Sequence, residues 1–318
     1  MNELVWFISS FIICLIGIYF FKKWSEKKEF ALGIDINKLD QRKVPEATGI
    51  VLLGSLWLIG VVYFLLEGFN PSFLGWLVLL SVFSFIGFFD DTRHKWTKKP
   101  LSWKIRAVPI ALASMGFAFF FSDSILLFVP LALFIAFIAS FHNTFAGLNG
   151  WEIGSSYIIS LAVIFLAVSS GFLFLALILS GIILALLLFN LYPAKVFPGD
   201  SGTLLIGAGI AGILVMTKDI QLILLGGMFY IPHIIDFVFL KMLTNAKDPS
   251  QTKIRPYKLL GDGKLAMPDY KDGARYDFAK LVIRVFGPLK EWKIVLIIWL
   301  IVVINCLLWL FLFQRISF

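Results

Sequence analysis

The sequence has little charge and almost no cysteine. Only 15% of its 318 residues are charged, whereas a soluble domain has roughly 25%, so the chain is not built to face water on all sides. Its 2 cysteines, Cys14 and Cys306, lie inside apolar runs, which argues against a disulfide framework or a cysteine metal site. No basic region precedes the first apolar run, so we expect a retained span rather than a cleaved signal peptide.

Apolar runs of membrane-span length recur instead from one end of the chain to the other. Hydrophobic residues make up 59% of the sequence, and the mean hydropathy is +0.91. We therefore predict an all-α polytopic membrane protein, with about ten transmembrane helices in one membrane domain over residues 1–318. The predicted spans are residues 4–21, 48–66, 73–89, 105–121, 125–141, 156–169, 172–189, 202–216, 220–240 and 294–313.

Basic residues predict the orientation of these spans. Residues 22–43 hold 7 Lys and Arg, residues 93–106 hold 6, residues 241–293 hold 12, and Lys195 stands alone between them. With ten spans all these segments fall on one side, which leaves only Lys218 and Arg315 on the other. The positive-inside rule places the basic side in the cytosol and both termini outside. The net charge of +8 then indicates contact with anionic lipid, and no nucleic-acid partner is expected.

The longest inner loop, residues 242–292, has predicted structure of its own. Residues 259–265 resemble a hairpin turn between short strands. Apolar residues such as Phe278, Val282 and Val285 then repeat at helical spacing, with Lys280 and Arg284 on other faces. This pattern predicts an amphipathic helix in the membrane interface.

Two adjacent carboxylates, Asp90 and Asp91, follow the third apolar run. Because like charges repel, at least one of them needs a metal ion or a cationic neighbour. The alternative is a solvated span end with no chemical role. His233 and Asp236 lie three residues apart near another span end. They could form a proton relay, but we favour a hydrogen-bonded pair that helps the helix end meet water.

Amides and glycines are concentrated in residues 141–152, where Asn143 and Asn149 could hydrogen-bond a nucleobase or a diphosphate. The alternative is a plain turn between two helices, since Asn-Gly is a common turn dipeptide. On residue chemistry alone the turn is favoured.

A Gly-Asp-Ser-Gly sequence at residues 199–202 leads directly into an apolar run. Asp200 would therefore lie near a helix N-terminus, either as an N-cap or as an Mg²⁺ ligand that holds a diphosphate. Backbone N–H groups at such a helix start can also bind anions. The motif is not a P-loop, because no Gly-Lys-Ser/Thr follows the glycines.

Lys253 and Arg255 lie beside a proline in the long inner loop. Such a cluster suits a phosphate-binding loop, in which Arg can clamp two oxygens. The alternative is ordinary loop charge attracted to anionic lipid.

Together these segments resemble the polyprenyl-phosphate N-acetylhexosamine-1-phosphate transferases, and in particular the UDP-N-acetylglucosamine–dolichyl-phosphate N-acetylglucosamine-1-phosphotransferase branch. The resemblance covers about residues 35–267. It rests on Gly-Ile-Asp-Ile-Asn-Lys at residues 33–38 with Val-Pro-Glu at 44–46, the Asp90-Asp91 pair, Asn143 with residues 146–150, and residues 192–200.

The resemblance implies a direct transfer of GlcNAc-1-phosphate from UDP-GlcNAc to a polyprenyl or dolichyl phosphate, with release of UMP. It implies Mg²⁺ as cofactor, a membrane-lipid environment and a homodimer. It also implies a cell-membrane location with a cytosolic active site. The site residues it implies are Asp200 for Mg²⁺, Asn143 for the diphosphate, Asn149 for uracil, Lys99 for phosphate, Asp90 or Asp91 for the lipid phosphate, and Glu46, Lys253 and Arg255 as further substrate-binding residues.

Several positions depart from the family pattern. Lys253 and Arg255 stand where the family usually has a histidine between basic residues, and Ser140 replaces an expected Asn. Asn149 stands where bacterial cell-wall members have Asp, which argues against a muramyl-pentapeptide substrate. The compact chain favours a prokaryotic, archaeal source.

Alternative functions are the same reaction with another UDP-N-acetylhexosamine, an ion-coupled membrane transporter, or a non-catalytic membrane scaffold. In a transporter, Asp90, Asp91, Asp200 and Asp236 would bind ions or substrate. However, transporter sites lie near the bilayer midplane, and these acids lie at one membrane face. A scaffold would not explain several polar clusters on one side.

Overall fold

Helices form at all ten predicted apolar runs. The computed structural model describes residues 3–97, 102–168, 170–242, 256–268 and 276–316. Runs of this apolarity become helices because a helix satisfies its backbone hydrogen bonds within the segment, as lipid requires. The helices are α1 Glu3–Lys28, α2 Gly49–Glu67, α3 Pro71–Thr97, α4 Trp103–Phe121, α5 Ile125–Thr144, α6 Trp151–Ala167, α7 Leu173–Asn190, α8 Gly199–Met216, α9 Ile220–Met228, α10 Ile231–Ile234, η1 Ile235–Met242, α12 Phe278–Phe286 and α13 Glu291–Ile316.

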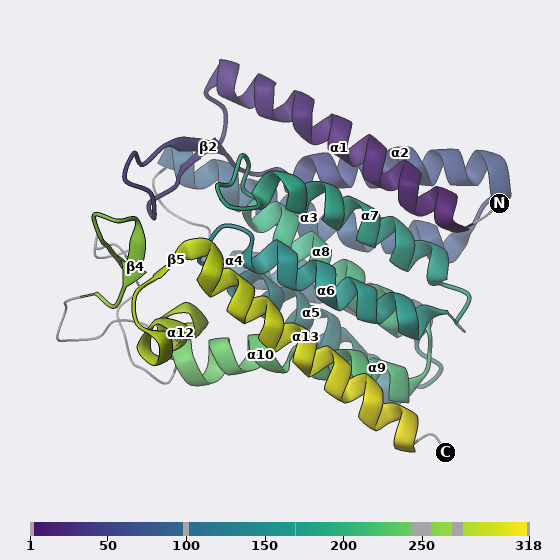
Figure 1. Ribbon diagram of the computed structural model, residues 1–318. Helices are drawn as coiled ribbons and strands as arrows, with labels where there is room; N and C mark the ends of the chain where they lie inside the picture. The colour runs from purple at the N-terminus through teal and green to yellow at the C-terminus, as the bar shows by residue number, and fades with distance from the viewer. Residues whose placement is uncertain (1–2, 98–101, 169, 243–255, 269–275, 317–318) are drawn as a thin grey trace.

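Eight of these helices are long and apolar enough to cross a membrane, and α9 with the α10–η1 segment makes a ninth if counted as one bent span. The helix at the remaining predicted run, α6, has only 17 residues. In Figure 1 the long helices lie side by side, and the two termini lie at the same end of the bundle. The chain is thus an all-α polytopic membrane protein, as predicted.

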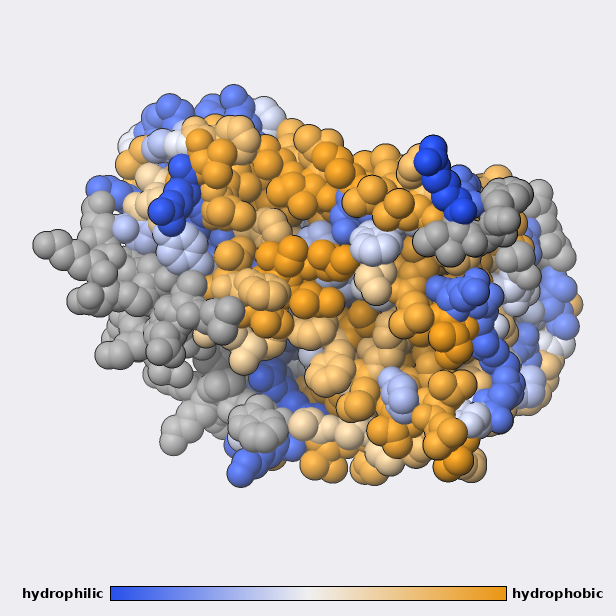
Figure 2. Space-filling model, turned by 90° about the horizontal axis from the view of Figure 1, so that it is seen from below, coloured by the Kyte–Doolittle hydropathy of each residue, from blue (hydrophilic) through white to orange (hydrophobic). Residues whose placement is uncertain are grey.

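The ends of the bundle differ in character. The short strands β1 Leu32–Ile34, β2 Lys43–Pro45, β3 Lys258–Leu259, β4 Lys264–Ala266 and β5 Leu289–Lys290 all lie at the end opposite the termini. At the other end, Lys218 forms an ion pair with Asp123. Figure 2 shows a broad hydrophobic band between hydrophilic residues at the two ends, which is the surface expected of a protein surrounded by lipid.

The predicted span 220–240 is not one straight helix. It bends by 54° between α9 and the segment that follows, and its second part is a π-helix over Ile235–Met242. Pro232 lies directly after the break, where its ring and missing N–H prevent continuous helical hydrogen bonding. Apolar length predicted a span over this run, and the structure shows that the segment is bent beside this proline.

Helix α8 forms the centre of the bundle, and its residues Ser201–Met216 are all buried. Its N-terminus lies against α2 and α3 at two glycines. A Cβ on Gly49 would lie 2.0 Å from the backbone nitrogen of Gly202, and one on Gly87 would lie 2.3 Å from the backbone of Ser201. These contacts leave no space for a side chain, so they set the position of the α8 N-terminus against the end of α3.

The long inner loop contains the predicted hairpin and helix. Strands β3 and β4 pair antiparallel, and β5 adds a third strand. Helix α12 exposes Leu281, Val285 and Phe286, but it buries Phe278 and Val282 against the protein. The side chain of Lys280 is also buried.

Lys280 was expected on a face of the helix other than the apolar one, but its side chain is buried, as those of Phe278 and Val282 are. Asp277 caps the helix, and the Lys280 ammonium lies 3.5 Å from its carboxylate and 5.3 Å from the centre of the Tyr257 ring. This local acid and the aromatic ring compensate the buried charge.

The predicted hydrogen-bonded pair of His233 and Asp236, helping the helix end meet water, is corrected by the structure. Both side chains are buried rather than meeting water. Asp236 accepts from the backbone N–H of Phe278 at 2.8 Å and forms an ion pair with Lys241 at 2.6 Å. His233 packs its ring 4.0 Å from that of Phe145. Asp236 thus links the bent span to the start of α12 instead of pairing with the histidine.

Candidate active site

A polar cavity of about 260 Å³ opens at the end of the bundle that carries the strands. Four separate segments form its walls: the β1–β2 loop, the α5–α6 loop, the end of α7 and the start of α8. The residues that line it are Ile34, Asp35, Ile36, Asn37, Glu46, Asn143, Ala146, Gly147, Leu148, Asn149, Glu152, Asn190, Phe197, Pro198, Gly199, Asp200 and Thr203. The predicted residues Glu46, Asn143, Asn149 and Asp200 are therefore brought together in one cavity.

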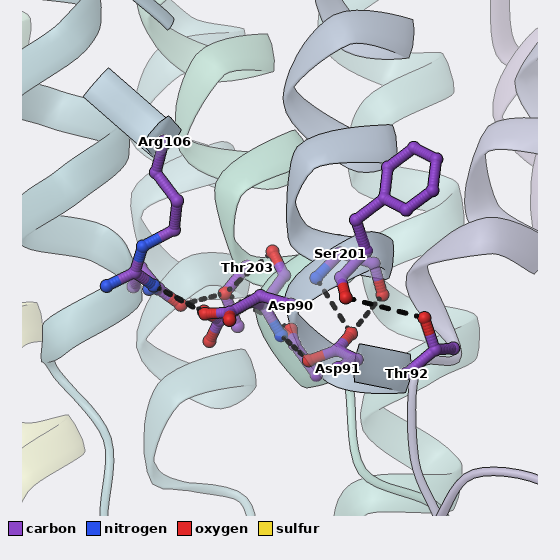
Figure 3. A network of polar contacts seen from close by, with 10 residues as sticks. Asp90, Asp91, Thr92, Arg106, Ser201 and Thr203 are labelled. Atoms are coloured by element: carbon purple, nitrogen blue, oxygen red, sulfur yellow. Dashed lines mark hydrogen bonds and ion pairs between the residues drawn. The ribbon is translucent and has the colours of Figure 1, made fainter. Parts of the chain in front are cut away.

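The adjacent carboxylates Asp90 and Asp91 point to different partners (Figure 3). Asp91 accepts from the backbone N–H groups of Asp200 at 2.8 Å and Ser201 at 3.1 Å, and from the Ser201 hydroxyl at 2.8 Å. The first N–H groups of a helix have no partner within the helix. Asp91 thus fulfils for α8 the capping role that was one of the two alternatives for Asp200.

Gly199 makes this cap possible. Its φ of +67° is a conformation that favours glycine, and a Cβ there would lie 2.3 Å from a carboxylate oxygen of Asp91. Because Asp91 binds the first turn of α8, the side chain of Asp200 is left to face the cavity.

Asp90 and Asp200 share one cation, the guanidinium of Arg106. A single nitrogen of Arg106 lies 2.7 Å from Asp90 and 3.0 Å from Asp200, and Figure 3 shows the Arg106 side chain directed toward Asp90. This cation resolves the repulsion expected of the Asp90–Asp91 pair. Sequence reasoning missed Arg106, although its place in the first turn of the fourth span was a signal that it could reach the membrane face.

Asn143 and Thr203 connect α5 to the first turn of α8. The Thr203 hydroxyl donates a hydrogen bond to the side-chain oxygen of Asn143 and also lies 3.2 Å from the Gly199 carbonyl. The amide of Asn143 is therefore held beside Asp200 at the floor of the cavity.

Asn149 also lines the cavity, and both its side chain and its backbone are held by hydrogen bonds. Its amide nitrogen donates to Asp35 at 2.9 Å, and its backbone N–H donates to Glu291, the first residue of α13, at 2.7 Å. Lys38 lies 3.5 Å from Asp35 and also forms an ion pair with Glu291. The β1–β2 loop, the α5–α6 loop and the last helix, α13, thus meet at this residue.

Tyr257 supports the same region from the long inner loop. Its hydroxyl donates to Asp277 at 2.9 Å and lies against Gly147 in the cavity wall. Burial is the main cause that raises the pKa of Tyr257 well above its usual value, and Asp277 adds to it. The phenol therefore stays protonated and remains a donor throughout the ordinary pH range.

Glu152 lines the cavity and is another residue of the site that sequence reasoning did not select. It is buried, and its Oε1 has no hydrogen-bond partner among the residues described. The signal was a carboxylate in the first turn of an apolar helix, beside the Asn-Gly motif. Such an unpaired buried oxygen is costly unless a ligand satisfies it.

The residues of this cavity fit Mg²⁺. Asp200, Glu152 and Asn143 can each offer a side-chain oxygen, the ligand that Mg²⁺ prefers. Mg²⁺ commonly takes only one or two carboxylates and completes its shell with phosphate and water. Within the described ranges there is no group of three or more His, Cys, Asp and Glu arranged to hold a metal by themselves. A metal here would therefore depend on its substrate for part of its coordination.

An apolar groove of about 390 Å³ lies between α4 and α5 and reaches the same point. Arg106 and Asn143 lie at its polar end, while Ile110, Phe137 and Leu204 line its interior. Asn143 lines both spaces, so the polar cavity and the groove meet beside the Arg106–Asp200 pair. The remaining predicted residues Lys99, Lys253 and Arg255 lie outside the described residues.

The fold and the site together define a membrane-embedded protein whose acids, amides and cations gather where the spans end. The model of glycosyl transferase family 4 matches residues 73–218, which include Asp90, Arg106, Asn143 and Asp200. A relative from Methanocaldococcus jannaschii that carries the name of a glycosyltransferase is 33% identical over 303 residues, covering 93% of this chain and 90% of that protein. The chain belongs to glycosyl transferase family 4.

Two further relatives carry more specific names. One from Sulfolobus acidocaldarius, named as a UDP-N-acetylglucosamine–dolichyl-phosphate N-acetylglucosaminephosphotransferase, is 29% identical over 92% of this chain and 90% of its own. One from Shouchella clausii, named as a phospho-N-acetylmuramoyl-pentapeptide-transferase, is 30% identical over 70% of this chain and 78% of its own. The predicted family resemblance is confirmed, and the chain is a transferase of phosphosugars.

Proposed function

We propose that this protein transfers GlcNAc-1-phosphate from UDP-GlcNAc to a polyprenyl phosphate of the dolichyl type, releasing UMP. The observation that carries the proposal is the meeting of the polar cavity and the apolar groove at Asn143, beside Arg106 and Asp200. A nucleotide sugar suits the first space and an isoprenoid chain the second. Their phosphates would then lie together where the two spaces join.

The reaction needs no nucleophile from the protein. An oxygen of the lipid phosphate attacks the β-phosphorus of the nucleotide sugar, and the bond from that phosphorus to the bridging oxygen breaks. The electron pair leaves with UMP, and GlcNAc remains on a lipid diphosphate. Phosphoryl transfer of this kind depends on positioning and on neutralising negative charge.

The chain's own residues supply both requirements. Arg106 contributes positive charge beside Asp90 and Asp200, at the polar end of the groove. We assign it to the lipid phosphate. Asn143 would orient the diphosphate without adding charge. Mg²⁺, held by Asp200 with Glu152 and Asn143 nearby, would neutralise the diphosphate when bound.

Asp90 and Asp91 have different roles in this proposal. Asp91 affects the site indirectly: its carboxylate accepts hydrogen bonds from the first backbone N–H groups of α8 and so holds the helix that carries Asp200. Asp90 holds Arg106 at the groove, so it would orient the cation that receives the lipid phosphate.

UDP-GlcNAc is proposed over other nucleotide sugars because archaeal relatives are named for it. The relatives named for the muramoyl-pentapeptide reaction keep another UDP-N-acetylhexosamine as the alternative. No repeated half or mid-span acid among the described spans supports the transporter. We place the active site on the cytosolic side of an archaeal cell membrane, following the distribution of Lys and Arg.

Radiolabel transfer by the purified protein tests this function. We expect label from UDP-GlcNAc to enter dolichyl phosphate, with UMP rather than UDP released and with loss of product when Mg²⁺ is chelated. UDP-GalNAc assayed in parallel separates the two sugars. Release of UDP, or no lipid product from either sugar, would contradict the proposal.

A further inference from the structure

Asn149 lies in the polar cavity with its side chain in one fixed orientation. Its amide nitrogen donates to a carboxylate oxygen of Asp35 at 2.9 Å, and both residues are almost fully buried. An ionised carboxylate only accepts hydrogen bonds. Asp35 therefore fixes the rotation of the Asn149 amide. The amide nitrogen faces Asp35, and the amide oxygen faces away from it.

The charge on Asp35 is supported by its surroundings. Lys38 lies 3.5 Å from Asp35 and also pairs with Glu291. Glu291 in turn accepts from the backbone N–H of Asn149 at 2.7 Å. The backbone and the side chain of Asn149 are thus held by two acids that share one lysine, which is more than a turn between two helices requires.

Uracil and cytosine differ at the atoms that such an amide would meet. Uracil presents an N–H donor at N3, whereas cytosine presents an acceptor there. An amide oxygen can accept from uracil N3–H, but against cytosine N3 it places two lone pairs together. In the proposed function the diphosphate is held beside Asp200, which lines the same cavity as Asn149, and this anchor limits how far the base can shift to find another pairing.

We propose that Asp35 is a positioning residue that makes the site selective for uridine over cytidine nucleotides, by holding the amide oxygen of Asn149 toward the base. This inference rests on the proposed function for the identity of the ligand, and it deepens that function by naming the residue that sets base selection. Without Asp35 the Asn149 amide can rotate, so it can present its oxygen to uracil N3–H or its nitrogen to cytosine N3 and bind either pyrimidine.

The test measures binding of UDP and CDP to the full-length protein in detergent, by calorimetry with Mg²⁺ present. We expect the wild type to bind UDP at least about tenfold tighter than CDP, since one unmatched polar contact has an effect of that order. In Asp35→Asn the ratio should fall close to one. Asp40→Asn removes an exposed carboxylate from the same loop and should leave the ratio unchanged.

An exchanged pair separates orientation from charge. Asn149→Asp alone places two buried carboxylates together and should weaken binding of both nucleotides. The double variant Asp35→Asn/Asn149→Asp restores one donor and one carboxylate at the same net charge. The carboxylate introduced at position 149 can only accept hydrogen bonds, as the fixed amide oxygen did in the wild type. The preference for UDP should therefore return. This variant also serves if Asp35→Asn alone does not fold.

The outcomes are distinguishable from failure of the proposed reaction. A folded Asp35→Asn that keeps the wild-type ratio, or a folded double variant that binds CDP as well as UDP, would overturn the inference while leaving the transferase intact. A wild type that prefers UDP but transfers nothing to lipid would overturn the reaction and support base selection. A wild type that binds both nucleotides equally would overturn the inference at once.

Discussion

Helices α8 and α4 both bring a charged residue to the active site, but they are packed very differently. Helix α8 is buried over Ser201–Met216 and touches α2 and α3 through glycines. Helix α4 exposes Val108, Leu112 and Phe119, and it lines apolar cavities of about 470 and 570 Å³ on its α3 side as well as the groove toward α5. The acid Asp200 therefore stands on a helix enclosed by other helices, whereas the cation Arg106 stands on a helix that presents apolar side chains to lipid.

This difference suits a reaction between one substrate from water and one from lipid. The metal and diphosphate need a position fixed to a fraction of an ångström. The cation needs to meet a lipid that enters from the membrane between helices. We infer that α8 supplies the fixed part of the site and α4 the adaptable part.

The largest expected effect is loss of the acid on the enclosed helix. Asp200→Asn should lower kcat at least about 100-fold, because an amide neither ligates Mg²⁺ as strongly nor balances its charge. Asp123→Asn, at the opposite end of the bundle, should leave activity within about twofold of wild type. The assay is label transfer at saturating Mg²⁺ and substrates. Full activity of Asp200→Asn would contradict its assignment.

Arg106 on α4 should tolerate a conservative substitution better than Asp200 on α8 does. Arg106→Ala should lower kcat roughly 100-fold, since it removes the positive charge beside Asp90 and Asp200. Arg106→Lys should recover about tenfold of that loss, because one nitrogen of Arg106 contacts both acids and a point charge can replace it. The KM for the lipid phosphate should rise in both variants. Equal activity of the Ala and Lys variants would show that charge at this position is not used.

The packing around α8 and around α4 can be compared by adding one methyl group at each helix through a glycine-to-alanine substitution. Gly87→Ala would place a Cβ 2.3 Å from the α8 backbone and should lower the free energy of unfolding by about 1–3 kcal/mol. Gly116→Ala, on α4, meets no atom within 4 Å, and it should stabilise or have no effect because alanine favours the helix. Thermal unfolding in detergent measures both, and equal destabilisation would argue against the difference in packing.

The smallest expected effect is on the cap of α8. Asp91→Asn keeps one acceptor for the helix N-terminus, so we expect a loss of only about 1 kcal/mol in the free energy of unfolding and a modest fall in activity. Asp90→Asn should instead lower kcat with little change in stability, because it weakens the hold on Arg106. The two neighbouring substitutions, measured by thermal unfolding and label transfer, thus separate support of the helix from support of the cation.

Local sequence patterns predicted the parts of this protein that depend on composition and neighbouring residues. Apolar length placed helices at every predicted run, since lipid allows a single chain segment little else. Gly-Asp-Ser-Gly placed Asp200 in the first turn of α8, and Asn-Gly at 149–150 marked the turn before α6. The kink at Pro232 could also have been predicted from the residue alone.

Contacts between distant segments could not be read in the same way. Arg106 lies 16 residues from Asp90 and 94 residues from Asp200 in the chain, and no local pattern pairs it with either. The burial of Lys280 depends on Tyr257, and the unpaired oxygen of Glu152 depends on the shape of the cavity.

The sequence by itself determined that this is a membrane protein with its polar motifs at one end, because hydropathy and the order of charged segments are properties of the chain. Only the tertiary structure decided what each polar group does. It turned Asp91 to the helix start, placed Arg106 between two acids, and set Asp35 against Asn149. The physical reason is that hydrogen bonds and ion pairs depend on distances of a few ångströms between segments whose approach is set by helix packing.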